Sequence, residues 1–304
     1  MITPFKLHQE IINIIGNYDI IKNYREGSKR TGVWEIQCKS DLKKYFVKSF
    51  TRKNRWHPEV FAYKNWIPEI LPYAPELIGV IDQYDVYAII ISSLEGITLR
   101  EAVGLSENQI SNAYYKAGEL TKILHKKFSG DYFGRPDCNG NPIEIFSHSD
   151  PVYYLNHSII EALEKGKELK CFENREIQLG EWVLKNTHLF QDCVPRAVSW
   201  DSSPNNWVVD ERTGEFLGFI DFENMLWGFE VDNFTMMYER YFPNFPKGKE
   251  AFFKGYGLEA LEEKSQQIKI ACIKAGLCNV VWGQVFNDET SVSLARKMLS
   301  IINI

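Results

Sequence analysis

Three polar side chains in this sequence have types and spacings that suit chemistry on phosphate groups. Asp201 and Asn206 lie five positions apart and lead into an apolar run, and Asp221 directly follows a second apolar run, Phe216 to Ile220. Two short strands joined by a turn would place all three side chains around one pocket. One carboxylate can then accept a hydroxyl proton, while an amide oxygen and a second carboxylate hold Mg²⁺ on a nucleotide.

The same segment also fits an ordinary hairpin with no chemical role. Asp, Asn, Ser and Pro are common turn residues for reasons of backbone geometry and local hydrogen bonding. The spacing alone therefore leaves both interpretations open, and the elements that would position the three side chains have to decide between them.

Composition sets the class of protein. The chain has 304 residues, of which 44% are hydrophobic and 25% are charged, as in soluble globular proteins. This length suffices for a sizeable core in two lobes or domains. The formal net charge of −5 argues against a non-specific nucleic-acid binder, which needs a basic face.

Cysteine spacing and apolar runs indicate the compartment. The six cysteines form no C-x-x-C pair and have no common zinc-site spacing, which is typical of inert thiols in a reducing compartment. Residues Met1 to Lys6 contain no apolar segment of a signal peptide. The longest apolar runs, such as Val86 to Ile91, are too short to span a bilayer. We therefore expect a cytoplasmic protein without a membrane partner.

The first third of the chain has the pattern of a small, mainly antiparallel sheet. A short helix is predicted over residues 4–15. Strands are then predicted from about residue 20 and over 33–38, 45–50, 77–81 and 86–91. The last of these is apolar throughout, which is typical of a central strand.

Lys48 interrupts the otherwise mostly apolar strand 45–50. It either points to solvent, as lysines in strands commonly do, or it reaches nucleotide phosphates from the inner face of the sheet. The second role requires a carboxylate that holds the lysine. Glu59 is the candidate partner, because it lies in the first turn of a helix predicted over 57–66 with Pro58 near its start.

From about residue 95 the pattern becomes mainly helical. Thr98 is expected to cap a short helix over 99–103. Ser106 and Gln109 have the spacing of a capping box before a long helix that ends near His125, which we expect to be a packed or capping histidine. Later helices are predicted over residues 153–172, 176–186, 231–241, 249–256, 258–275, 279–286 and 291–301.

The order of these features resembles the aminoglycoside phosphotransferase family, whose members have a protein-kinase-like fold. The resemblance extends from about Tyr24 to Tyr241, and Phe219 to Glu223 looks very like the metal-binding segment of that family. Residues 74–79, 94–99 and 118–125 are similar too. The resemblance implies an α+β fold with an N-terminal nucleotide-binding lobe, residues 1–94, and a mainly helical catalytic and substrate-binding lobe, residues 95–304.

The resemblance also implies roles for the polar residues in an ATP- or GTP-dependent phosphotransferase. Asp201 would be the catalytic residue that orients the acceptor hydroxyl and receives its proton. Asn206 and Asp221 would bind Mg²⁺. Lys48 would contact the α- and β-phosphates and pair with Glu59.

Further nucleotide contacts are expected in the N-terminal lobe. Backbone groups of Ser92 and Leu94 would meet the base, and Ile91 would line the pocket behind it. Gly27 and Ser28 lie in a polar turn whose backbone N–H groups can approach phosphates closely. An ordinary hairpin turn explains the same turn residues.

The sequence departs from the family at the catalytic loop. The usual His-Gly-Asp reads Ser199-Trp200-Asp201. Ser199 can replace part of the hydrogen bonding of the family histidine, and Trp200 fills space where the family has glycine. Because Asp201, Asn206 and Asp221 are all retained, we interpret the chain as a divergent active enzyme.

The acceptor is expected to be a small molecule with a hydroxyl group, modified by a monomeric or homodimeric enzyme. An aminoglycoside-like antibiotic would make the protein a resistance kinase. Such a polycation needs an acidic cleft, and four acidic residues near the metal segment could supply it or could be ordinary surface charges: Glu223, Glu230, Asp232 and Glu239.

Two other functions stay open. The acceptor could be a metabolite such as choline, a sugar or homoserine. The altered Ser199-Trp200 pair also fits a non-catalytic nucleotide-binding protein, a pseudokinase that acts through partners, although the retained polar residues argue against it. A protein kinase is disfavoured because the chain has no H-R-D or A-P-E signature.

Overall fold

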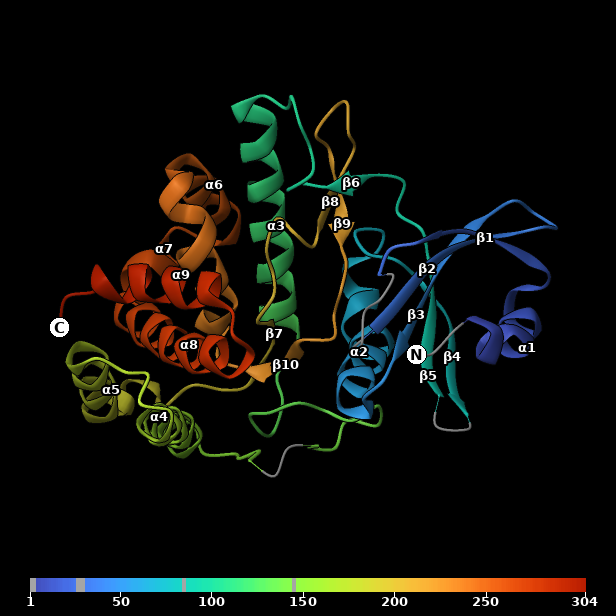
Figure 1. Cartoon of the computed structure of the whole chain (residues 1–304). Helices are drawn as coiled ribbons and strands as arrows, with labels where there is room; N and C mark the ends of the chain where they lie inside the picture. Colours follow the sequence, from blue (N-terminus) through green and yellow to red (C-terminus); the bar gives the residue numbers. More distant parts are fainter. Residues whose placement is uncertain (1–3, 26–30, 84–85, 144–145) are drawn as a thin grey trace.

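An antiparallel sheet forms the N-terminal lobe (Figure 1). The computed structural model describes residues 4–25, 31–83, 86–143 and 146–304. Within these residues the sheet has the order β1-β2-β3-β5-β4, with β5 inside the sheet as its apolar run predicted. Its strands are β1 (Tyr18–Asn23), β2 (Thr31–Cys38), β3 (Lys44–Phe50), β4 (Leu77–Gln83) and β5 (Val86–Ser92).

Both faces of this sheet are buried, because successive side chains along a strand point to opposite faces. Val47 and Ile90 pack on one face with residues of helix α1 (Pro4–Ile15). Ile89 and Ile91 face the other way, toward the core of the helical lobe. Lys48 lies opposite Ile89 in the β3–β5 register, so its side chain leaves the sheet on the side of the helical lobe.

Helix α2 (Lys53–Asn65) begins four residues before the predicted start at 57. Pro58 and Glu59 therefore lie in its second turn, which corrects the prediction that Pro58 is near the helix start and Glu59 in the first turn. Trp56 explains the extension, because it is 2% exposed and its indole Nε1 donates to the carbonyl of Ala88, 3.1 Å away. This bond anchors the first turn on β5, a long-range contact that local sequence rules do not contain.

The helix predicted after Thr98 does not form. Strand β6 (Ile97–Thr98) pairs with β8 (Trp207–Val209), and the N–H of Leu99 donates to the carbonyl of Trp207 at 2.7 Å. The Thr98 hydroxyl donates to the Glu101 carboxylate at 2.8 Å instead of capping a helix. Pairing with a strand more than 100 positions away thus overrides the local capping signal.

Helix α3 (Glu107–Lys127) begins with the predicted capping box of Ser106 and Gln109. It packs along α6 (Pro246–Tyr256), and a side chain on Gly118 would lie about 2.1 Å from the carbonyl oxygen of Phe252. Near the end of α3, His125 is 1% exposed and its Nδ1 lies 2.9 Å from the Tyr256 hydroxyl. His125 is therefore a packed histidine, as predicted.

The remaining helices differ in part from the prediction. Residues 231–241 form no α-helix but the 3₁₀ segment η3 (Glu230–Phe234) and the π-helical segment η4 (Met237–Tyr241). Short 3₁₀ turns are η1 (Ile67–Ile70), η2 (Thr187–Phe190) and η5 (Phe242–Asn244). The α-helices are α4 (Pro151–Glu168), α5 (Asn174–Asn186), α7 (Glu259–Glu263), α8 (Ser265–Phe286) and α9 (Glu289–Ser300).

Helix α8 is continuous where two helices were predicted. Gly276 does not interrupt it. The missing side chain at this position lets Leu299 of α9 pack closely against α8. By length and composition alone, α8 is the one helix in the described part of the chain that could cross a membrane. Over half of its most apolar window, 56%, is buried inside the helical lobe, which is typical of a core helix.

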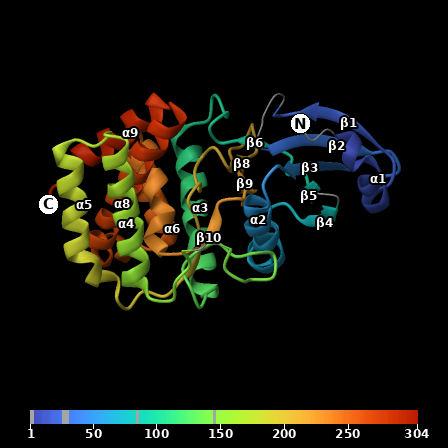
Figure 2. The ribbon, with the colours of Figure 1, turned by 60° about the horizontal axis from the view of Figure 1, so that its bottom comes forward.

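Two short strand pairs hold the loops that carry the polar residues. Strand β8 pairs with β9 (Phe216–Phe219), so the segment with Asp201 precedes β8 and Asp221 follows β9, as predicted. Strand β7 (Arg196–Ser199) pairs with β10 (Met225–Gly228) on the other side of the same loops. Figures 1 and 2 show the β8–β9 pair between α3 and the N-terminal lobe, and Figure 1 shows β7 and β10 beside the lower end of α3. Each loop is therefore tied at both ends.

Candidate active site

The loop that carries Asp201 is held by its own hydrogen bonds. The N–H of Asp201 donates to the Ser199 hydroxyl at 3.3 Å, and the Asn206 amide nitrogen donates to the Asp201 carbonyl at 2.8 Å. The N–H of Ser199 donates to the side-chain oxygen of Asn233 at 2.9 Å. The guanidinium of Arg135 lies 5.5 Å from the ring centre of Trp200. Ser199 thus supports the loop by hydrogen bonding, and Trp200 faces a cation.

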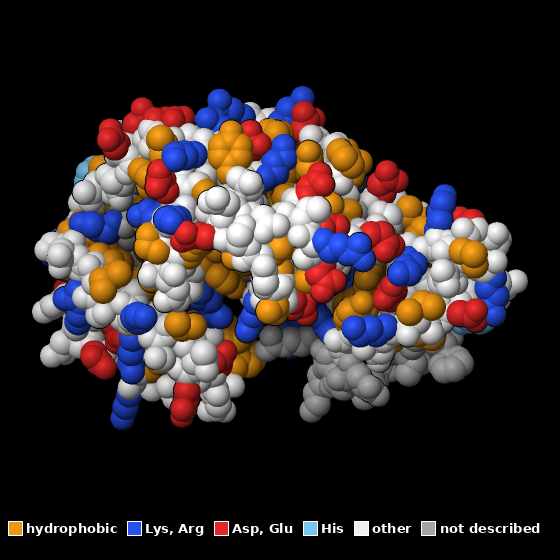
Figure 3. All heavy atoms as spheres, turned by 90° about the horizontal axis from the view of Figure 1, so that it is seen from above, with side chains coloured by type: hydrophobic (Ala, Val, Ile, Leu, Met, Phe, Trp, Pro, Cys, Tyr) orange, Lys and Arg blue, Asp and Glu red, His pale blue; other side chains and the backbone are white. Residues whose placement is uncertain are grey.

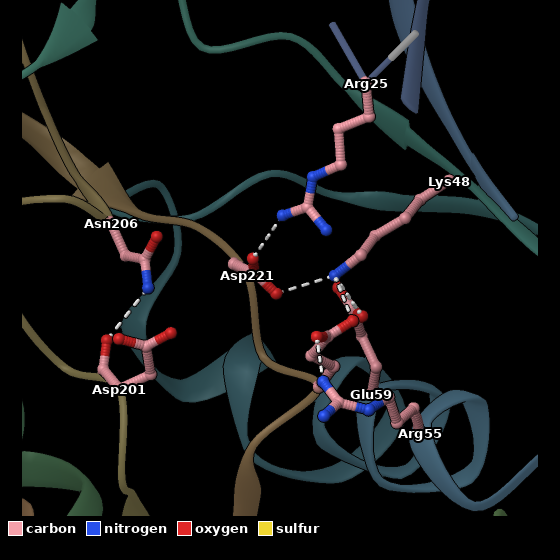
Figure 4. A network of polar contacts seen from close by, with 8 residues as sticks. Arg25, Lys48, Arg55, Glu59, Asp201, Asn206 and Asp221 are labelled. Atoms are coloured by element: carbon pink, nitrogen blue, oxygen red, sulfur yellow. Dashed lines mark hydrogen bonds and ion pairs between the residues drawn. The ribbon is translucent and has the colours of Figure 1, made fainter. Parts of the chain in front are cut away.

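Asp221 lies at the centre of the polar network (Figure 4). Its φ of +64° is in the left-handed region, which a non-glycine residue adopts only when surrounding contacts hold it there. One carboxylate oxygen is 2.6 Å from the Lys48 Nζ, and the other is 3.1 Å from an Arg25 nitrogen. In Figure 4, Asp201 and Asn206 lie on one side of Asp221 and Lys48 on the other.

Lys48 is 5% exposed and is held by three carboxylates. Its Nζ lies 2.6 Å from Glu59, 2.6 Å from Asp221 and 3.4 Å from Glu223. Burial lowers the pKa of Lys48, but attraction to the three carboxylates outweighs burial and raises that pKa above its usual value. The ammonium group therefore stays charged in the core. The structure thus brings together the lysine and the glutamate that the sequence paired.

Two basic residues complete this network, and the sequence prediction named neither. Arg25 lies just beyond β1, and Arg55 lies in the first turn of α2, where its guanidinium contacts Glu223 at 2.6 Å. Arg55 precedes Glu59 by four positions, so the two share a helix face. The four-residue spacing of Arg55 and Glu59 could have indicated that they share a helix face. The predicted helix began at residue 57, after Arg55, so this spacing was not used.

The two aspartates of the site have different electrostatic surroundings. Burial, followed by repulsion from Asp221, raises the pKa of Asp201 to about 6. Burial alone would also raise the pKa of Asp221, but Lys48 and Arg25 overcome it and lower that pKa below its usual value. Asp201 can therefore exchange a proton near neutral pH, while Asp221 remains an anion.

The donor groups around Asp221 fit a magnesium ion. The Asp221 carboxylate and the Asn206 side-chain oxygen are hard oxygen donors, and the Asn206 amide nitrogen is already used by the Asp201 carbonyl. Oxygen atoms of Glu59, Asp221 and Glu223 also lie within 4.8 Å of one another, but the Lys48 ammonium contacts all three. Asp221 and Asn206 could therefore hold a metal ion, whereas Glu59 and Glu223 are paired with Lys48.

The four acidic residues expected to bind a cationic acceptor are all paired with basic side chains. Glu223 contacts Arg55, Glu230 contacts Lys264 at 2.7 Å, Asp232 contacts Lys274 and Glu239 contacts Arg240 at 2.9 Å. On the face shown in Figure 3, acidic and basic side chains are interspersed rather than separated by sign. These four residues therefore provide no open acidic surface.

Some of the groups expected to contact the nucleotide base are already hydrogen-bonded within the protein. Ile91 is 8% exposed and belongs to the core on the side of the helical lobe. The N–H of Ser92 donates to the carbonyl of Glu76, and the carbonyl of Leu94 accepts from Gly96. Those two backbone groups are thus already used within the protein. Gly27 and Ser28 lie outside the described residues.

Comparison with known proteins relates this geometry to a family. A profile described as the phosphotransferase enzyme family matches residues 37–266, more than half of the chain. A comparison with curated protein sequences gives no match.

Solved structures share the fold over nearly the whole chain. A thermostable mutant of aminoglycoside phosphotransferase APH(4)-Ia, in a ternary complex with AMP-PNP and hygromycin B, is 14% identical with a TM-score of 0.74, covering 97% of each chain. The gentamicin–APH(2'')-IIa complex is 16% identical with a TM-score of 0.65, covering 100% of this chain and 98% of that one. A putative fructosamine-3-kinase from Haemophilus somnus 129PT is 16% identical with a TM-score of 0.64, covering 96% and 95%.

Proposed function

Because the chain belongs to the phosphotransferase enzyme family and has its kinase-like two-lobed fold, we propose that it transfers the γ-phosphate of ATP or GTP to a hydroxyl group of a small molecule. One observation carries this proposal. Asp201, Asn206 and Asp221, which are separated in sequence, converge beside the buried Lys48–Glu59 pair. These are the groups that phosphoryl transfer needs for positioning and charge neutralisation.

Each of these polar residues then has a defined task. Asp201 orients the acceptor hydroxyl and accepts its proton, which its raised pKa of about 6 permits. Lys48 neutralises phosphate charge and is held in place by Glu59. Asp221 and Asn206 would hold Mg²⁺, which supplies further neutralisation of the phosphate oxygens when bound.

We propose that the nucleotide base binds at the end of β5, next to Ile91. Because the N–H of Ser92 and the carbonyl of Leu94 are used within the protein, the base would use the Ser92 carbonyl and the Leu94 N–H instead. Residues 1–94 would then be the nucleotide-binding lobe. A cytoplasmic location is proposed as well, in keeping with the six free cysteines of the described chain.

Two classes of acceptor are proposed. An aminoglycoside-like antibiotic is suggested by the hygromycin B and gentamicin bound to proteins of this fold. A sugar-type metabolite is suggested by the similar fold of a putative fructosamine-3-kinase, and the pairing of Glu223, Glu230, Asp232 and Glu239 with basic residues favours an acceptor that is less cationic than an aminoglycoside.

A transfer assay with labelled γ-phosphate tests the proposal. ATP and GTP are each offered with aminoglycosides, sugars, amino sugars, choline and homoserine. We expect transfer to at least one acceptor, loss of transfer in Asp201→Ala with nucleotide binding largely retained, and normal transfer in Asp192→Ala, which removes an exposed carboxylate outside the site. Full activity of Asp201→Ala would refute the proposed base. Tight nucleotide binding without transfer to any acceptor would favour the pseudokinase.

A further inference from the structure

Arg25 and Arg55 are the two cations of the polar network to which the proposed mechanism assigns no task, and of the two Arg25 contacts Asp221. Its guanidinium lies 3.1 Å from one oxygen of Asp221, while Lys48 occupies the other oxygen at 2.6 Å. Figure 4 shows the two cations reaching Asp221 from different directions. The carboxylate assigned to the metal is therefore covered by two positive charges that come from separate elements of the N-terminal lobe.

The two cations differ in their other partners. The Lys48 side chain is 6% exposed and also contacts Glu59 and Glu223, so it remains paired if Asp221 is taken by a metal ion. The Arg25 side chain is 39% exposed, and Asp221 is its only carboxylate partner among the residues that the structure describes. Metal binding to Asp221 would therefore leave the Arg25 guanidinium without a counter-charge beside the cleft.

A metal held by Asp221 would bring the terminal phosphates of a nucleotide to the same place. The phosphates would then enter the space next to Asp221, where the Arg25 guanidinium now lies 3.1 Å from that carboxylate. Arginine suits this contact, because its planar fork of N–H donors matches phosphate oxygens in a bidentate way and it stays charged at all relevant pH values.

We propose that Arg25 is a phosphate-binding residue that exchanges its contact with Asp221 for the terminal phosphates when the metal–nucleotide complex enters. The inference rests on the proposed nucleotide-dependent function. In this arrangement Lys48 and Arg25 neutralise the phosphates from two sides, and Arg25 covers Asp221 only in the nucleotide-free protein.

The alternative is that Arg25 merely blocks the metal ligand, and the two accounts predict effects of opposite sign. If Arg25 binds phosphate, its removal weakens triphosphate binding. If Arg25 only competes with the metal, its removal strengthens Mg²⁺-dependent binding, because Asp221 is freed from one of its two cations.

Titration calorimetry on the 304-residue chain separates these outcomes. The ligands are adenosine, AMP and ATP, and the matching guanine series, each with and without Mg²⁺. The variants are Arg25→Gln, Arg25→Lys and Lys22→Gln. The last removes an exposed charge near the end of β1, where the Lys22 ammonium packs over the Tyr24 ring at 4.2 Å rather than on Asp221.

We expect Arg25→Gln to lose about tenfold in triphosphate affinity, as for a charged hydrogen bond, with nucleoside affinity unchanged. Arg25→Lys should lose less, and Lys22→Gln should match the wild type. Equal or tighter Mg²⁺–triphosphate binding by Arg25→Gln, with normal nucleoside binding, would overturn the inference alone. Failure of the wild type to bind any nucleotide would overturn the inference together with the proposed function.

Discussion

At the level of single residues, Asp201 and Asp221 show how identical side chains acquire different properties. Burial and the neighbouring Asp221 raise the pKa of Asp201 to about 6, whereas Lys48 and Arg25 keep Asp221 ionised. Divergent pKa values of two nearby carboxyl groups commonly mark a proton acceptor and a permanent anion. The surroundings thus support a base at Asp201 and a metal ligand at Asp221.

The raised pKa of Asp201 predicts a pH dependence. A carboxyl group with a raised pKa is protonated below that pKa and then cannot accept the acceptor's proton. We expect kcat/KM to be constant above about pH 7 and to fall by about tenfold per pH unit below about pH 6. A pH–rate profile measures this, with nucleotide binding followed in parallel. An acidic limb near pH 4, the usual value for aspartate, would contradict the predicted surroundings.

Replacing Asp221, the proposed metal ligand, gives a second prediction at this scale. Asp221→Ala should weaken Mg²⁺–nucleotide binding by roughly tenfold or more, because a ligand oxygen is lost. Nucleoside binding should persist, since Lys48 keeps Glu59 and Glu223 as partners. Calorimetry with and without Mg²⁺ measures both quantities. Unchanged affinity for the Mg²⁺–nucleotide complex would remove Asp221 from the metal site.

At the level of elements, one face of α2 aligns Lys48 with the segment that carries Asp221 and Glu223. Arg55, Glu59 and Tyr63 follow at intervals of four and so share that face. Arg55 contacts Glu223, Glu59 contacts Lys48, and the Tyr63 ring meets Phe222 edge-on at 5.1 Å. The helix therefore relates two chain segments that are far apart in sequence.

Helices α3 and α6 meet at a buried histidine. His125 is 1% exposed, lies 2.9 Å from the Tyr256 hydroxyl and has a pKa lowered by burial to about 4. In the unfolded chain the same group has the ordinary pKa of about 6.5. The folded state therefore holds this histidine neutral at pH values where the unfolded chain protonates it.

This difference predicts acid sensitivity of the fold. Stability from His125 is fully present above about pH 6.5 and is lost as the pH falls toward about 4, by a total of about 3 kcal/mol. Urea unfolding at pH 7.5, 5.5 and 4.5 measures the slope. His125→Asn should be less stable at pH 7.5 but less sensitive to acid, and the exposed His188→Asn should behave as the wild type. An unchanged slope in His125→Asn would exclude this residue as the cause.

At the level of the whole molecule, ion pairs connect the two lobes. Lys48 and Arg25 reach Asp221 from the sheet lobe, and Arg55 reaches Glu223. The chain itself passes between the lobes after Ser92 at the end of β5, and β6 (Ile97–Thr98) already pairs with β8 of the helical lobe. A boundary at residue 94 remains a prediction that fits this path.

The partial burial of the Arg55–Glu223 pair predicts a measurable coupling between the lobes. The two side chains are 28% and 7% exposed, so solvent screens their attraction only in part. A double-mutant cycle with Arg55→Gln and Glu223→Gln should give a coupling energy of about 1–3 kcal/mol in urea unfolding. The exposed pair Lys53–Asp82, 44% and 46% exposed, should give less than about 1 kcal/mol. Equal values for the two pairs would refute the predicted coupling.

Much of this protein could be inferred from local sequence. Short apolar runs marked the strands on either side of Lys48, and Ser106 with Gln109 marked the start of α3. The order of Lys48, Glu59, Asp201, Asn206 and Asp221 indicated the fold and the candidate site. The strand and cap signals depend on neighbours a few positions apart, whereas the order of the five polar residues pointed to the fold through the family resemblance.

Only the tertiary structure decided which charges meet. Arg25 and Asp221 are 196 positions apart, and Arg55 and Glu223 are 168 positions apart, so no local pattern relates them. The same holds for the pairing of Glu230 with Lys264 and of Asp232 with Lys274, and for the pairing of Ile97–Thr98 with β8 where a helix cap was expected. A side chain's charge is set by its residue type, but whether that charge is free or neutralised depends on what the fold places beside it.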